Sequence, residues 1–137
     1  MLPFLEKYEV IDTSIKPIIV NLAGNNGLLT KDNYIFDLTA NFSIRVHPER
    51  RSILNVAQSV GIEKATSQEY LEEVFIPKFS EALRIVASKF EFEEIKSNLE
   101  HLKAQTLQVI PKDLNGFILD DLSINYIPST IKKLNLG

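Results

Sequence analysis

The clearest pattern in the sequence is the alternation of apolar and polar residues over residues 34–46. The apolar positions of this run are Tyr34, Phe36, Leu38, Ala40, Phe42, Ile44 and Val46. Successive side chains of a strand point to opposite faces, so one face of this segment is apolar and the other is polar. We therefore predict a long antiparallel strand whose apolar face packs on helices.

Weaker strand patterns lie on either side of this segment. Residues 8–21 are rich in Val and Ile, and Pro17 favours an edge position because proline cannot donate to a strand ladder. Alternation returns over residues 117–127, where Pro128 is expected to end the strand. Turns are expected at residues 24–27, 32–33 and 115–116, all rich in Gly, Asn or Asp.

The middle of the chain has helical periodicity. His47 and Pro48 are expected to open a helix to about Val60. Thr66 and Glu69 have the spacing of a capping box, and a helix to about Lys89 should follow. Its inward residues would be Leu71, Phe75, Phe79, Leu83 and Val86.

Two features bear on how these helices continue. Pro77 lies inside the helix that follows the capping box, and it predicts a kink or a break. Residues 92–110 predict one further helix, which Pro111 ends, with an inward face made of Ile95, Leu99, Leu102, Thr106 and Val109.

Composition narrows the class of protein. With 137 residues the chain amounts to about one domain. It has no Cys, which excludes disulfides, Cys-ligated metals and a thiol nucleophile. The net charge of −3 argues against a dedicated nucleic-acid binder, which normally has a basic surface.

The residues with reactive side chains form no recognisable catalytic or metal-binding motif. His47 and His101 have no ligand-type neighbours at metal spacing, and GNNGLLTK at residues 24–31 lacks the residue order of a phosphate loop. Asp120 and Asp121 are adjacent on a predicted strand, so they point to opposite faces and indicate a bend or bulge. We therefore predict no catalytic residues, no cofactor and no metal site.

Four segments, taken in order, resemble the SPFH (band 7) domain. They are the strand at residues 34–46 with its entry LTKDN, the run KFSEALR at residues 78–84, the acidic start FEFEEI at residues 90–95, and DLNGF at residues 113–117 with the strand that follows. The resemblance covers about residues 3–129 and is most like the bacterial flotillin-like membrane proteins. We therefore assign residues 1–129 to the domain and residues 130–137 to a truncated tail leading toward a C-terminal helical region.

The resemblance implies a fold and a function. The fold would be α+β, with a curved antiparallel β-sheet packed against three to four helices. The function would be that of a non-enzymatic scaffold on the cytoplasmic face of a membrane, which forms homo-oligomers and organises membrane microdomains. Expected partners are membrane lipid, further copies of the chain and a small membrane protein of the NfeD type, with no nucleic acid, while this segment itself would be soluble.

Apolar residues next to turns or at the start of the chain are the candidates for contact with lipid. These membrane-proximal candidates are Leu2, Phe4, Leu5, Leu28 and Leu29. Ordinary packing at strand ends would explain the same residues equally well. A different class of function also stays open, namely a small ligand-binding domain or enzyme that uses the concave face of the sheet.

Overall fold

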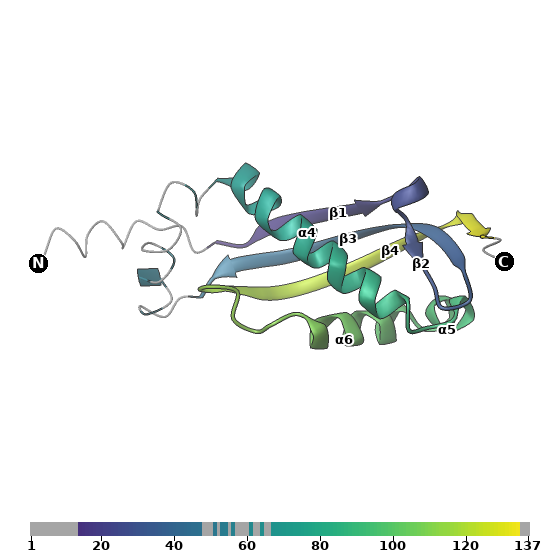
Figure 1. Cartoon of the computed structure of the whole chain (residues 1–137). Helices are drawn as coiled ribbons and strands as arrows, with labels where there is room; N and C mark the ends of the chain where they lie inside the picture. Colours follow the sequence, from purple (N-terminus) through teal and green to yellow (C-terminus); the bar gives the residue numbers. More distant parts are fainter. Residues whose placement is uncertain are drawn as a thin grey trace, which may run out of the picture.

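The computed structural model describes residues 14–47 and 67–134, together with positions 51, 53, 54, 56, 61 and 64. The sheet strands are β1 (Lys16–Leu22), β2 (Leu28–Leu29), β3 (Tyr34–Val46) and β4 (Phe117–Lys133), with a short 3₁₀ turn η1 (Gly24–Asn26) after β1. The helices with defined bounds are α4 (Gln68–Ala87), α5 (Phe92–Ser97) and α6 (Leu99–Val109). This arrangement is the α+β fold that we predicted, with the helices on one side of an antiparallel sheet (Figure 1).

β3 is the central strand of the sheet. β1 and β2 pair with one of its edges and β4 pairs with the other, in all cases antiparallel. The alternation predicted for residues 34–46 is confirmed, because every second residue from Phe36 to Val46 is buried. β1 pairs only with β3 within the described residues, so Pro17 lies on an edge strand as expected.

β4 continues beyond Pro128, so the prediction that the strand ends there is wrong. Asp37 pairs with Ile127, whereas Ile35 pairs with Lys132, and the intervening residues of β4 form an irregularity opposite a single residue of β3. Regular pairing is interrupted where proline could not donate, and it resumes because the end of β3 still offers a free edge. Residues 130–133, which we expected in a tail, therefore lie in the sheet.

α4 is one continuous helix, with the inward face that we predicted. Pro77 does not break it. Pro77 and Glu73 are both exposed, so the Glu73 carbonyl that proline leaves without an intrahelical donor can bond to water. The N-cap, however, is Ser67 and not Thr66, because the Ser67 hydroxyl accepts from the Tyr70 N–H at 3.3 Å.

The predicted helix over residues 92–110 is two helices, α5 and α6. Asn98 separates them with φ −152° and ψ 81°, and its side chain accepts from the His101 N–H at 3.2 Å. The side chain thus supplies the first turn of α6 with a local partner that competes with helix continuation. After the break, Ile110 is buried in place of Val109, which is 40% exposed.

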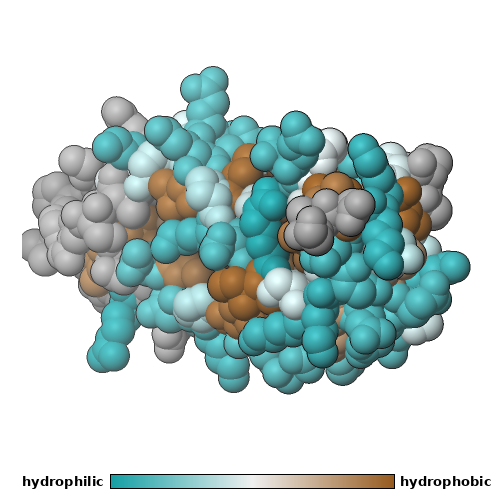
Figure 2. Space-filling model, turned by 45° about the vertical axis from the view of Figure 1, so that its right-hand side comes forward, coloured by the Kyte–Doolittle hydropathy of each residue, from teal (hydrophilic) through white to brown (hydrophobic). Residues whose placement is uncertain are grey.

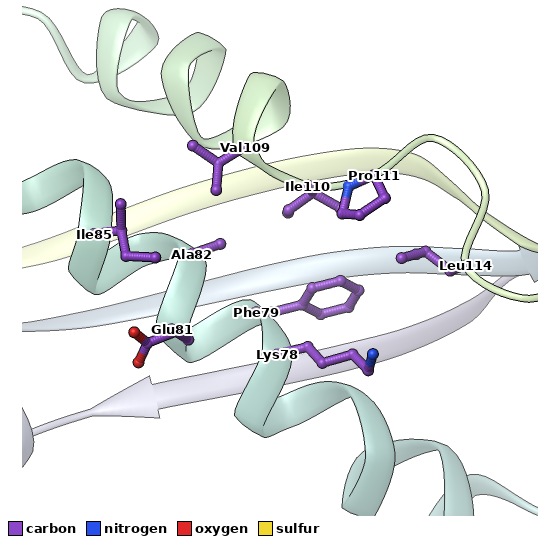
Figure 3. A pocket seen from close by; sticks show the side chains of 9 residues that line it. All are labelled: Lys78, Phe79, Glu81, Ala82, Ile85, Val109, Ile110, Pro111 and Leu114. Atoms are coloured by element: carbon purple, nitrogen blue, oxygen red, sulfur yellow. The ribbon is translucent and has the colours of Figure 1, made fainter.

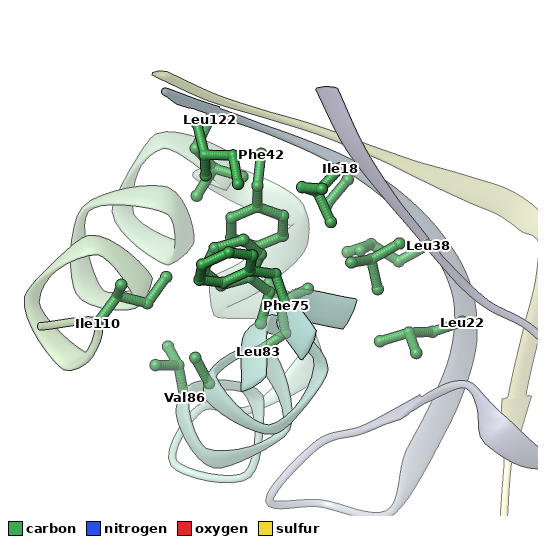
Figure 4. Packing of buried hydrophobic residues seen from close by; sticks show 14 of the residues in the cluster. Ile18, Leu22, Leu38, Phe42, Phe75, Leu83, Val86, Ile110 and Leu122 are labelled. Atoms are coloured by element: carbon green, nitrogen blue, oxygen red, sulfur yellow. The ribbon is translucent and has the colours of Figure 1, made fainter. Parts of the chain in front are cut away.

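The core lies between the sheet and the helices. Figure 4 shows the sheet bending around the side chains that point from it toward α4 and α6. Phe42 stacks on Phe79 with ring centroids 4.3 Å apart, and Phe79 stacks on Phe75 at 5.4 Å. The concave side of the sheet is therefore filled by the protein's own apolar side chains.

The helix predicted from His47 to Val60 lies mostly outside the described residues. Its described members, Arg51, Ile53, Leu54 and Val56, are helical, and Val56 is fully buried. His47 is not helical, and its N–H donates to the Gly116 carbonyl at 2.9 Å. Gly61 has φ +95° and its N–H donates to the Val56 carbonyl, as expected of a residue that ends a helix.

Candidate interaction surface

An apolar groove of about 290 Å³ lies between α4 and the segment that joins α6 to β4. Figure 3 shows Ile85 on α4 and Val109 and Ile110 on the other wall lying toward one another, whereas the Glu81 carboxylate points away. Lys78, Phe79, Glu81, Ala82 and Ile85 line it from α4, and Val109, Ile110, Pro111 and Leu114 line it from the other wall. Most of these side chains are aliphatic, so the groove offers apolar contact surface rather than a set of reactive groups.

The α4 wall follows from the helical repeat. α4 buries at least one side chain in each turn, including Leu71, Phe75, Phe79, Ala82 and Val86. The residue just before each of these lies on the neighbouring stripe of the helix. We call this neighbouring stripe the α4 flank; it consists of Tyr70, Val74, Lys78, Glu81 and Ile85. Ile85 is 38% exposed, so the apolar character of α4 extends beyond the face that the core uses.

The opposite wall follows from the end of α6. Pro111 cannot continue the helix, and the chain leaves it in an extended conformation at Ile110. As a result Ile110 packs into the core while Val109 remains at the surface of the groove. Leu114, held by a reciprocal pair of hydrogen bonds with Phe117, closes the wall.

A smaller cavity of about 60 Å³ extends the groove toward the start of α4. It shares Lys78 and Leu114 with the larger one and adds Tyr70 and Val74 from the α4 flank. The two cavities together therefore follow the α4 flank over most of its length. Figure 2 shows several brown apolar patches, one of them near the middle, on a face that is otherwise mostly hydrophilic.

Two charges of opposite sign lie on the α4 flank at the edge of the groove. Lys78 and Glu81 are exposed and stand one helical turn apart. No ion pair within residues 14–47 and 67–134 engages either of them, whereas Arg45 pairs with Asp120 and Lys103 with Asp121. Lys78 and Glu81 are thus available to an external partner.

A family model decides which class of protein this is. The model of the SPFH domain / Band 7 family matches residues 1–133. The chain belongs to this family. Proteins with an SPFH domain are generally membrane-associated, non-enzymatic scaffolds. No curated protein matches the chain.

Two further observations on this SPFH domain concern membrane crossing and metal binding. No helix in the described part of the chain has both the length and the hydropathy that crossing a membrane requires. Within the same residues, no three His, Asp or Glu side chains are placed to share a metal ion.

The predicted membrane-proximal residues of this SPFH domain differ in their positions in the structure. Leu2, Phe4 and Leu5 lie outside the described residues. Leu28 is completely buried, and a side chain in the core cannot contact lipid, so the prediction for Leu28 does not hold. Leu29 is 37% exposed and pairs with Ile35.

Leu29 lies far from the start of the sheet. Lys16, the first residue of β1, pairs with Ile44, which is nine positions from Ile35 along β3. At about 3.3 Å per residue, the two ends of the sheet are about 30 Å apart. Leu29 and the chain that enters at β1 therefore occupy opposite ends of the sheet.

The sheet face opposite the helices is mostly polar, although the exposed Ile19 also lies on it. Asn21, Thr39 and Asn125 form one cross-strand row, in which the Thr39 hydroxyl donates to the Asn21 side chain at 2.8 Å. The strand register skips Asp120, because Ser43 pairs with Asp121 and Ile44 with Leu119, so the predicted bulge is confirmed.

Sequence reasoning missed the groove because it assigned α4 a single inward face. Val74 and Ile85 are apolar but do not belong to that inward face, and they could have indicated a second apolar surface on the helix. Their spacing, however, could not reveal that the α6–β4 segment forms a second wall. That wall depends on the break at Asn98 and on the turn at Pro111.

Proposed function

We propose that this SPFH domain is the scaffold module of a flotillin-like protein at the cytoplasmic face of a membrane. It contributes to homo-oligomeric assembly and thereby to the organisation of membrane microdomains. Family membership supports the scaffold role. The observation that carries the proposal for assembly is the surface groove, whose aliphatic walls include the exposed side chains of Ile85 and Val109.

On a membrane, weak contacts between copies of the domain would be sufficient for assembly. Copies held on one surface experience a high effective concentration, so a contact that is negligible in dilute solution can become populated. A groove of this size suits such a contact, because it holds only a few aliphatic side chains.

Lipid contact is proposed for Leu2, Phe4 and Leu5 and, separately, for Leu29. Leu29 lies at the opposite end of the sheet from the start of β1, so its contact with lipid is proposed independently of the other three. A small membrane protein of the NfeD type is proposed as a further partner, supported only by the flotillin-like resemblance of the sequence.

The test places the chain on a membrane and measures its self-association. Donor- and acceptor-labelled copies carrying an N-terminal His tag are bound to vesicles that contain a nickel-chelating lipid. Energy transfer should exceed that of an unrelated tagged protein of similar size at the same surface density. Equal transfer for the two proteins would refute the proposal.

A further inference from the structure

We propose that the groove binds the α4 helix of a second copy of this chain, with the two α4 helices antiparallel about a two-fold axis. The inference rests on the assembly function proposed above and names the contact that would produce it. In such an arrangement each helix is at once the occupant and one wall of the binding site, so every contact occurs twice.

The charges of the α4 flank fit this arrangement. In an antiparallel pair centred between Lys78 and Glu81, the Lys78 side chain of one copy faces Glu81 of the second copy, and the reverse pair forms at the same time. A parallel pair in equal register would instead place like charges opposite each other. Since neither residue has an ion-pair partner within the described residues, the second copy completes both pairs.

The apolar residues of the α4 flank fit the same register. Val74 of one copy faces Ile85 of the second copy, where the groove is lined by Val109 and Ile110. The reciprocal contact brings Ile85 toward the smaller cavity lined by Tyr70 and Leu114. The apolar side chains thus fill the two cavities, and the charges lie between them at the axis.

The spacing along the α4 flank indicates how the helices cross. Steps of four, four, three and four residues separate its members, which approximates a heptad repeat. Helices packed through such stripes cross at about 20° with axes about 8–10 Å apart. This small angle keeps Val74 and Ile85 of the two copies in contact on both sides of the axis.

Disulfide trapping tests the register directly, because the chain has no native Cys. Copies with Val74→Cys and copies with Ile85→Cys are mixed under oxidising conditions at a concentration on the order of 0.1–1 mM, suited to a weak contact. The mixed disulfide should form. Val74→Cys alone should not dimerise, since its two thiols would lie about 16 Å apart along the helices.

Charge substitutions test the same contact without new bonds. Lys78→Glu and Glu81→Lys should each weaken self-association about tenfold, measured by sedimentation velocity. A mixture of the two variants should associate again, because each then faces an opposite charge at both positions. Glu73→Lys changes an exposed residue elsewhere on α4 and is the matched control, which should associate as the unmodified chain does.

Several results would overturn the inference. They are a Val74→Cys homodimer that forms as fast as the mixed disulfide, the absence of the mixed disulfide, and a mixture of the charge variants that fails to recover. The vesicle experiment separates this failure from failure of the proposed function. If Lys78→Glu retains full energy transfer on vesicles, assembly uses another surface; if the unmodified chain shows none, the assembly function itself is wrong.

Discussion

The Oδ1 atom of Asp32 lies 3.0 Å from the backbone nitrogen of Phe92, the first residue of α5. The same oxygen accepts from the Thr30 hydroxyl at 2.6 Å. The first N–H groups of a helix have no intrahelical partner, so a carboxylate from the turn before β3 supplies one of them. This contact ties the β2–β3 turn to α5 across a large separation in sequence.

The Asp32 contact predicts a dependence of stability on pH. The hydrogen bond from Thr30 and the backbone N–H of Phe92 outweigh burial and lower the pKa of Asp32. A lowered folded-state pKa means that the stabilisation is present above the unfolded value of about 3.9 and is lost as pH falls through the folded value. Asp32→Asn should therefore lower the free energy of unfolding at pH 7, and this difference should shrink below about pH 4.

Urea denaturation of both proteins at several pH values measures the Asp32 effect. The exposed Glu73→Gln on α4 serves as the control and should leave the free energy of unfolding nearly unchanged at pH 7. A difference between Asp32→Asn and the unmodified chain that is the same at pH 7 and pH 3 would show that the charge of Asp32 is not responsible.

Phe79→Ala should lower the free energy of unfolding by about 3–5 kcal/mol. Phe79 is 1% exposed and stacks on both Phe42 and Phe75, so its removal leaves a cavity in the centre of the core. Ile85→Ala, on the same helix but exposed to the groove, should cost less than about 1 kcal/mol. Urea melts that show equal losses would mean that the helix register is wrong.

Pro77→Ala should stabilise the domain. Alanine is about 3 kcal/mol more favourable than proline inside a helix, and part of that gain is offset because alanine loosens the unfolded chain. Since Pro77 is exposed and α4 already passes through it, we expect a net increase of about 1–2 kcal/mol in the free energy of unfolding. A decrease, measured by thermal or urea unfolding, would assign Pro77 a packing role.

Asn98→Ala tests what separates α5 from α6. Loss of the side-chain cap on His101 should cost about 0.5–2 kcal/mol of unfolding free energy, as for other helix N-caps. Lys96→Ala, two positions earlier and exposed, is the control and should have little effect. If Asn98→Ala is neutral, the packing of Ile95 and Leu102 holds the two helices apart without the cap.

Local patterns predicted the elements whose residues repeat regularly. The alternation of β3 and the inward face of α4 follow from side-chain direction alone, and both are confirmed. The continuity of α4 across Pro77 could not be read locally. Burial of Leu71, Phe75, Phe79 and Leu83 on both sides of the proline stabilises the helix by more than the roughly 3 kcal/mol that proline costs.

Elements whose outcome depends on a distant partner were predicted less well. β4 continues past Pro128 because Tyr34 and Ile35 offer an edge to pair with, and Leu28 is buried because its pairing with Phe36 turns it toward the core. Neither partner can be identified from the neighbouring residues. The same holds for the groove, whose two walls come from segments about 30 positions apart.

The sequence by itself determined the α+β class, the apolar face of β3 and the family to which the chain belongs. These depend on periodicity and on the order of short segments, both of which are local properties of the chain. The tertiary structure alone decided where β4 ends, which of Val109 and Ile110 is buried, and that the α4 flank faces a second wall. Each of these depends on which surfaces meet after the chain has folded, because burial is a property of contacts between segments.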